Sequence, residues 1–194
     1  MKKKGKKKNK AWIIYLVLIV AVILPYFGMF WIKGWYEKKL SDVTRVSFLL
    51  INKENLTLTA YDSSGDVVVT FPVACGAAWG NKVEKGDNRT PEGIFRITEI
   101  QNASSWKHDF GDGEGEISGA YGPWFIRLYT DPHKGIGIHG THLPNSIGTR
   151  CTEGCIRLRN EDVAQLKELS YPGLNVIITP SSQDAIANKE TAKF

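Results

Sequence analysis

The pattern of hydrophobic and polar positions divides the chain into one long apolar segment followed by a series of short alternating segments. The apolar segment runs from Ala11 to Ile32 without a charged side chain. A helix rises about 1.5 Å per residue, so a segment of this length reaches about 33 Å and can cross a hydrocarbon core of about 30 Å. The pattern therefore predicts one transmembrane helix over residues 11–32.

The charges before this segment predict its orientation. Residues 1–10 contain seven lysines, and the positive-inside rule keeps such a tail in the cytoplasm. A cleaved signal peptide is the alternative, but the apolar segment is long and no Ala-x-Ala-type cleavage site follows it. We therefore expect a cytoplasmic polybasic tail, a single-pass anchor in the plasma (inner) membrane, a juxtamembrane linker over residues 33–44, and a domain on the outer, periplasmic side.

Beyond about residue 45, apolar and polar residues alternate in short runs, which is typical of strands buried on one face. Polar turns separate the first three runs and predict a β-meander. The expected strands are Val46–Ile51, Leu56–Tyr61, Val67–Cys75, Ile94–Ile100, Pro123–Thr130, Gly135–His139, Cys155–Arg159 and Leu174–Thr179.

Three further segments complete the expected domain. Asn160 is a suitable N-cap for a short helix that ends near Ser170. Residues 101–121 break the alternation with several glycines and carboxylates, and we interpret them either as a mobile flap beside a substrate groove or as a solvated acidic loop. Residues 45–179 then form one mostly β domain, and residues 180–194 form a loose polar tail.

The net charge of +5 does not indicate nucleic-acid binding. Without the seven lysines of the tail, the chain has 18 basic and 20 acidic side chains, so residues 11–194 carry about −2. The tail itself would lie against an anionic inner leaflet. The expected partners are therefore a membrane and the substrate of the domain, and no nucleic acid.

The stretch from Gly135 to Asn160 carries the candidate chemistry. Cys155 begins an alternating run, so its thiol would share one face of a strand with two arginines. A cysteine is a good nucleophile when it is largely thiolate, which calls for a base, cationic neighbours and backbone N–H groups that bind the oxyanion. Gly154 permits a positive φ and would leave N–H groups near Cys155 free. His139, which ends an upstream strand, is the candidate base.

These residues resemble the L,D-transpeptidase catalytic domain family, which cross-links bacterial peptidoglycan through a cysteine acyl-enzyme. The family pattern is a strand ending in His-Gly-Thr, a loop, and Ser/Thr-x-Gly-Cys-Ile-Arg before a helix. The matching residues here are His139-Gly140-Thr141 and Thr152-Glu153-Gly154-Cys155-Ile156-Arg157. The resemblance implies a β-sandwich or open barrel with one or two short helices, which acts on peptidoglycan stem peptides without a cofactor.

The resemblance also implies a role for each matched position. It makes Cys155 the nucleophile and His139 the base, and it puts Thr152 and Gly154 in the oxyanion turn. The implied substrate-binding residues are Gly140, Thr141, Glu153 and Arg157. One position departs from the family pattern, because many members carry a second histidine where this chain has Glu153. A carboxylate cannot donate a proton as an imidazolium does.

Other interpretations use the same residues. With water in place of an amine acceptor, the site would be an L,D-carboxypeptidase. A zinc-stabilised envelope module would need nitrogen and sulfur ligands in a tetrahedral set. The residues that offer such ligands are His139, His142, Cys151 and Cys155. A non-catalytic wall-binding domain is the remaining alternative.

The three cysteines allow two disulfide pairings in an oxidising compartment. A bond between Cys75 and Cys151 would leave Cys155 as a free thiol. A bond between Cys151 and Cys155 would instead lock the nucleophile. The sequence leaves both pairings open.

Overall fold

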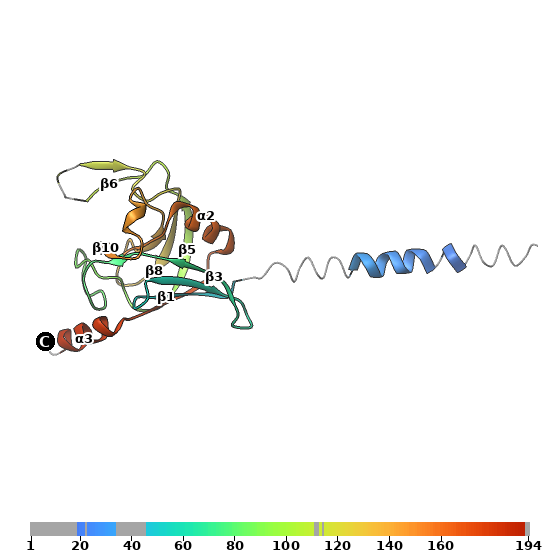
Figure 1. The fold of residues 1–194 in the computed structure, drawn as a ribbon, viewed down its shortest axis with the longest axis horizontal. Coiled ribbons are helices and arrows are strands. Elements are labelled where there is room, and N and C mark those ends of the chain that lie inside the picture. The colour runs from blue at the N-terminus through green and yellow to red at the C-terminus, as the bar shows by residue number, and fades with distance from the viewer. Residues whose placement is uncertain (1–18, 22, 34–45, 111–112, 114, 193–194) are drawn as a thin grey trace, which may run out of the picture. The chain divides into compact units, whose positions relative to one another are not determined.

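The chain divides into two compact units, Met1–Thr44 and Arg45–Phe194. The computed structural model describes residues 19–21, 23–33, 46–110, 113 and 115–192 (Figure 1).

In the first unit, the described residues are helical and exposed. Their large apolar side chains have between 43% and 77% of their surface exposed. Within the described residues, we find no helix with both the length and the apolar character that a membrane crossing requires. The polybasic tail, the start of the 11–32 segment and nearly all of the linker lie outside the described residues, so the transmembrane helix stays a prediction.

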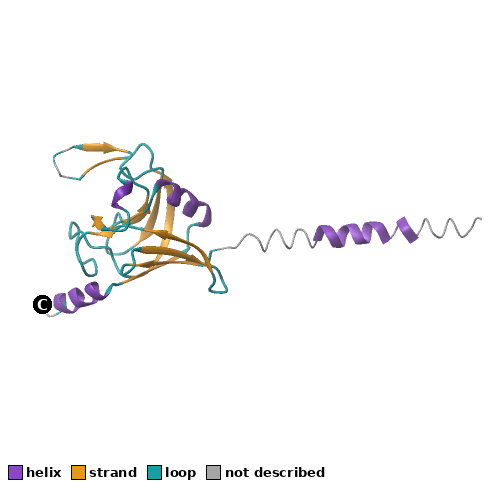
Figure 2. Cartoon of the chain, in the orientation of Figure 1, coloured by secondary structure: helices purple, strands orange, loops and turns teal. Residues whose placement is uncertain are grey.

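The regular structure of the second unit is mainly strands, joined by loops (Figure 2). Eight of the strands form one mixed sheet in the order β11-β9-β8-β5-β12-β1-β2-β3, and this sheet curls (Figure 1). The bounds are β1 (Phe48–Asn52), β2 (Thr57–Tyr61), β3 (Val67–Pro72), β5 (Gly93–Asn102), β8 (Trp124–Tyr129), β9 (Gly137–His139), β11 (Ile156–Arg157) and β12 (Asn175–Thr179). The mostly β class is confirmed, and one curled sheet takes the place of the two stacked sheets of a sandwich.

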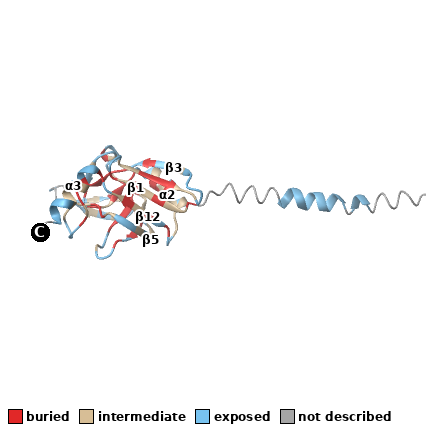
Figure 3. Ribbon diagram, turned by 90° about the horizontal axis from the view of Figure 1, so that it is seen from below, coloured by how far each residue is buried: buried red, intermediate tan, exposed pale blue. Residues whose placement is uncertain are grey.

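The alternating pattern explains which residues form the core of this sheet. In β1, Leu49 and Ile51 are fully buried while their neighbours are half-buried. β8 departs from strict alternation, because Phe125 and Ile126 are both buried. Ile126 belongs to the core cluster, whereas Phe125 is covered on the other face by aromatic rings, among them Trp106. Buried residues gather on the central strands (Figure 3).

Two pairs of short strands stand outside the main sheet. β4 (Cys75–Gly76) pairs with β10 (Arg150–Thr152), and β6 (Lys107–Asp109) pairs with β7 (Glu116–Ser118). The β6–β7 hairpin lies in residues 101–121, where the alternation breaks, so this segment contains two short strands that alternation did not predict. Whether it is a mobile flap stays a prediction. The hairpin projects from the domain in Figure 1.

The helix α2 (Asn160–Leu169) forms where the sequence predicted it, with Val163 and Leu166 buried. The predicted cap is wrong, because Arg159 occupies the N-cap position and no side chain caps the helix. The side chain of Asn160 instead accepts a hydrogen bond from the Thr141 N–H at 2.8 Å. This residue therefore ties the helix to the loop that follows β9.

The predicted loose tail is also wrong, because residues 182–191 form a helix, α3 (Ser182–Thr191). Ser181 and Asp184 make a reciprocal capping box at its start. The Asp184 carboxylate also accepts from Arg150 at 2.8 Å and lies 3.2 Å from the Lys53 ammonium. Lys53 and Asp184 are buried, so the helix is attached to the domain through charged groups.

Candidate active site

Cys155 lies in the turn between β10 and β11, at a point where the backbone requires glycine. Gly154 has a φ of +129°, which is unfavourable for residues with a side chain. A Cβ on Gly154 would also lie 2.7 Å from the Arg89 carbonyl oxygen. The sequence Gly-Cys is therefore needed to bring the thiol close to the neighbouring backbone.

Two threonines hold this turn. The Thr152 hydroxyl donates to the Cys155 carbonyl at 2.6 Å and accepts from the Gly154 N–H at 3.2 Å. The buried Thr90 hydroxyl donates to the Gly154 carbonyl at 3.0 Å. The Gly154 N–H is therefore not free, contrary to the sequence-based expectation. The Cys155 N–H has no acceptor among the described residues.

His139 reaches the same site through parallel strand pairing. Ile156 of β11 pairs with Ile138 of β9, so the preceding residue, Cys155, lies beside Gly137. The His139 Nδ1 is 2.6 Å from the Gly140 carbonyl oxygen. A carbonyl can only accept, so Nδ1 carries the proton and Nε2 keeps its lone pair. The ring is thus held in the tautomer that can act as a base.

Burial makes both groups neutral at rest. It is the main cause that lowers the pKa of His139 to about 3, and the charge on Arg157 lowers it further. Burial likewise raises the pKa of Cys155 to about 11, although a hydrogen bond with the Gly137 backbone acts in the opposite direction. The Arg157 guanidinium lowers the pKa of Cys155, as its charge predicts, but burial has the larger effect. The site therefore holds a thiol, which donates to the Gly135 carbonyl at 3.5 Å, and a neutral imidazole in the wall of the same cavity.

Aromatic rings fix the orientation of the His139 imidazole. Phe125 stacks on it with centroids 5.6 Å apart and ring planes 5° apart. Tyr121 meets it edge-on at 4.9 Å. Gly137 makes room for Phe125, because a Cβ there would lie 2.3 Å from the phenylalanine ring. Alternation alone predicted neither aromatic contact.

Gly140 and Thr141 follow His139 in the chain and help to hold it in place. Both are buried and neither lines the cavity described below, so the structure does not support their expected contact with substrate. Asn160 lies against Gly140, where a Cβ would be 2.3 Å from its side-chain oxygen, and it binds the Thr141 N–H. These residues position the end of β9. The role of Asn160 could not be predicted from the sequence, because its place before a helix favoured an N-cap.

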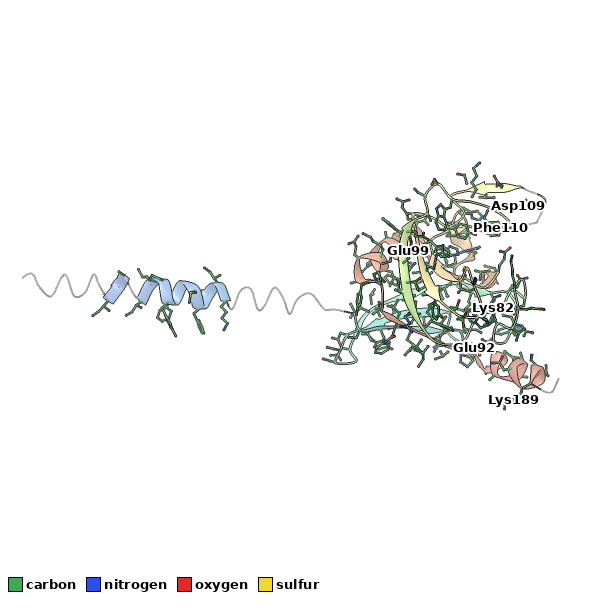
Figure 4. All side chains as sticks on the ribbon, turned by 180° about the vertical axis from the view of Figure 1, so that it is seen from behind. Lys82, Glu92, Glu99, Asp109, Phe110 and Lys189 are labelled. Atoms are coloured by element: carbon green, nitrogen blue, oxygen red, sulfur yellow. The ribbon has the colours of Figure 1, made fainter. Side chains whose placement is uncertain are left out.

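A cavity of about 380 Å³ opens over Cys155. Lys82 and Phe110, which belong to separate loops on the same side of the domain (Figure 4), both line it. The predicted site residues that line it are Cys155, His139, Thr152, Glu153 and Arg157. The structure therefore gathers most of the predicted site in one cavity.

Arg157 lies in the wall of this cavity and is only 5% exposed. Its Nη1 donates to the Ser146 hydroxyl at 3.0 Å and to the Cys151 sulfur at 3.7 Å. Its buried Nε has no partner, and its guanidinium has no carboxylate partner among the described residues. Arg159 is exposed and does not line the cavity, whereas Arg157 is buried in its wall.

Glu153, which departs from the family pattern, contacts a histidine from a distant segment. Its Oε2 lies 3.1 Å from Nε2 of His108 on β6. The other ring nitrogen of His108 lies 3.0 Å from the Tyr121 hydroxyl. All three residues line the cavity. The roles of His108 and Tyr121 could not be predicted from the sequence, because a contact between residues 45 positions apart leaves no local pattern.

The structure does not assemble the four residues of the zinc interpretation. Within the described part of the chain, no three His, Cys, Asp or Glu side chains are grouped as metal ligands. His142 lies near the Ala120 carbonyl, and the Cys151 sulfur lies near the Ser146 carbonyl and Arg157. Neither of the two disulfide pairings that the sequence left open is present in the structure. All three cysteines are free, with Cys75 buried and Cys151 exposed.

Comparisons with known proteins agree with this geometry. The model of the L,D-transpeptidase catalytic domain family, YkuD, matches residues 47–178. YkuD of Bacillus licheniformis is 30% identical over 132 residues, which cover 68% of this chain and 65% of that protein. YqjB of Bacillus subtilis is 34% identical over 138 residues, which cover 70% and 73%. The chain thus belongs to the L,D-transpeptidase catalytic domain family, although its match spans less than two thirds of the first of these relatives.

A solved structure supports the same fold. The catalytic domain of the Enterococcus faecium L,D-transpeptidase superposes with a TM-score of 0.52 at 17% identity. The superposition covers 71% of this chain and 99% of that domain. At this identity the likeness establishes the fold alone.

Proposed function

We propose that this chain is a cysteine-dependent L,D-transpeptidase that acts on peptidoglycan stem peptides through a thioester acyl-enzyme. The observation that carries the proposal is the arrangement of Cys155 and His139. A thiol at a glycine turn and an imidazole with a free Nε2 lone pair line one cavity. Family membership supports the same chemistry.

In the first half of the reaction, Cys155 attacks the amide carbonyl that follows the L-centre of the diamino acid in a stem tetrapeptide. His139 Nε2 takes the thiol proton as the C–S bond forms, so a free thiolate need not exist before attack. The Cys155 N–H faces the developing oxyanion. The C–N bond then breaks, and D-alanine leaves with the proton that His139 held.

In the second half, an amine from a neighbouring stem or another acceptor attacks the thioester carbonyl. The new amide forms, the C–S bond breaks, and the thiol is restored. Water as the acceptor would make the same site an L,D-carboxypeptidase, which is the alternative function. The transpeptidase and the carboxypeptidase differ only in the second half of the reaction, because both form the same acyl-enzyme.

The charges around the cavity favour a substrate that carries carboxylates. Arg157 offers a buried guanidinium without a carboxylate partner among the described residues. Lys85 and Lys134 line the same cavity and an adjoining one of about 510 Å³. Neither lysine has an ion-pair partner in the described part of the chain. Stem peptides carry carboxylates that such groups can bind.

We also propose that residues 11–32 anchor the protein in the plasma membrane, with the domain on the outer side. The seven lysines of the tail and the uncharged segment after it support this topology. Peptidoglycan is cross-linked on the outer side of the membrane, so the topology would bring Cys155 to its substrate.

The test of the proposed function is the intact mass of the full chain after incubation with a carbapenem, which acylates an activated nucleophile. Wild type should gain one drug mass and Cys155→Ala should gain none. Cys151→Ala is the matched control and should react like wild type, because Cys151 does not line the cavity. A folded, reduced wild type without an adduct would contradict the proposal.

A further inference from the structure

Two imidazoles line the active-site cavity among the described residues, and the mechanism above uses one of them. The unused one belongs to His108 in β6, outside the family motif. Its side chain is 26% exposed and contacts Glu153 from the β10–β11 turn. The β10–β11 turn is therefore joined, through Glu153, to a histidine from a distant segment of the chain.

The two contacts of His108 fix its protons. An ionised carboxylate can only accept, so Nε2, 3.1 Å from Glu153, carries a hydrogen. In the neutral ring Nδ1 is then the acceptor, and it receives the Tyr121 hydroxyl hydrogen at 3.0 Å. The carboxylate, the imidazole and the phenol thus form a chain of hydrogen bonds that leads into the cavity.

Tyr121 connects this chain to the reacting groups. Its ring lies edge-on to His139, with centroids 4.9 Å apart. Burial raises its pKa, and the nearby Cys155 and Glu153 raise it further. Its hydroxyl therefore keeps its proton at neutral pH and can donate it to His108.

Packing holds the β6–β7 hairpin where His108 can hydrogen-bond with both Glu153 and Tyr121. The Phe110 ring meets the His108 ring edge-on at 4.4 Å and lies 5.4 Å from the His142 ring. The Arg157 guanidinium lies over the Phe110 ring, 6.0 Å from its centroid. His108 is therefore fixed by contacts with the wall of the site as well as by Glu153.

We propose that Glu153, His108 and Tyr121 form a second proton-transfer group, which takes the proton of the acceptor amine. This inference rests on the proposed function. Tyr121 would touch the amine, His108 would hold the proton, and Glu153 would orient the imidazole and stabilise its charged form.

The amine nitrogen bonds to the thioester carbon, and the C–S bond breaks to release the Cys155 thiolate. The amine proton passes to the Tyr121 oxygen while the phenol proton passes to His108 Nδ1. The imidazolium then loses its proton to water, and the thiolate takes one from water, which restores the starting state.

The test separates the two halves of the reaction in the full chain. The first half is followed by the rate of carbapenem adduct formation. The second is followed with a stem tetrapeptide as donor and D-methionine as the acceptor amine. In His108→Ala we expect the carbapenem rate to stay within about twofold of wild type and the transfer to D-methionine to fall about 100-fold. The tripeptidyl-enzyme should then accumulate and be visible by intact mass.

Two further variants keep the test independent of any effect of His108→Ala on folding. Tyr121→Phe preserves the ring against His139 but removes the hydroxyl, and it should also accumulate the tripeptidyl-enzyme. Lys107→Ala is the matched control, because this exposed residue lies on the same strand but lines neither cavity, and both halves should be unchanged.

Two results would overturn the inference while leaving the proposed function intact. One is an equal loss of both halves in His108→Ala, which would mean that the residue only packs the hairpin. The other is unchanged transfer in both His108→Ala and Tyr121→Phe. A wild-type protein that forms no carbapenem adduct would instead overturn the proposed function, and this inference with it.

Discussion

The resting protonation of Cys155 and His139 has a direct consequence for reactivity. With a pKa of about 11, Cys155 is a thiol at neutral pH, and His139, with a pKa of about 3, is neutral. A simple alkylating agent reacts with the thiolate, whose fraction rises about tenfold per pH unit below the pKa. We therefore expect the rate at which iodoacetamide alkylates Cys155 to rise continuously up to pH 10. No plateau should begin near pH 6.

This measurement needs a background in which Cys151 does not react, because that thiol is exposed. Cys151→Ser provides it, and Cys75 is buried. The rate is read by intact mass. A plateau that begins near pH 6 would show a thiolate–imidazolium pair at rest, which would contradict the neutral pair.

At the residue scale, the sequence predicted the groups that lie in one local motif. Cys155, His139 and Thr152 share the cavity because a strand, a turn and a second strand carry them. His108 and Asn160 could not be assigned in this way. Their contacts depend on where the hairpin and α2 pack, and nothing in their immediate neighbours encodes that packing.

At the element scale, α3 is held by Asp184. Burial alone would raise the pKa of this carboxyl, but the Ser181 hydrogen bonds, the Gly80 N–H and the Lys53 charge lower it to about 2. Because the folded pKa lies below the unfolded value of about 4, the stabilisation is complete above pH 4 and is lost as the pH falls towards 2. The ion pairs of α3 should therefore hold throughout the neutral range.

The variant Asp184→Asn tests this attachment. It leaves the buried Lys53 and Arg150 without their shared carboxylate. We expect the free energy of unfolding at pH 7 to fall by about 3 kcal/mol, measured by urea denaturation. Lys189→Gln, on the same helix (Figure 4), should change it by less than about 0.5 kcal/mol. Equal stability of the two variants would contradict the role of Asp184.

The strands and α3 show what a local pattern can predict at this scale. Alternation found the strands of the main sheet because each buries one face in the core. It missed α3 because the helix buries Asp184 and leaves Ile186 about half exposed. The sequence does contain a signal, since Ser181 and Asp184 have the spacing of a capping box.

At the scale of the whole molecule, the sheet order depends on contacts between distant segments. The predicted meander of β1, β2 and β3 is confirmed by antiparallel pairing. β12 then inserts between β1 and β5, parallel to the first and antiparallel to the second. No local pattern encodes this insertion, because it depends on which edge of the sheet the last strand reaches.

The division into two units predicts the result of removing the first. Among the described residues, every member of the core cluster lies between Val46 and Ile178, so we expect residues 45–194 to fold without the first unit. We expect a chain without residues 1–44 to keep the melting temperature and the carbapenem adduct rate of the full protein. If residues 11–32 are the anchor, the shortened chain should move from the carbonate-washed membrane fraction to the soluble fraction. A shortened chain that stays with the membranes would place the anchor elsewhere, and one that unfolds would make the first unit part of the fold.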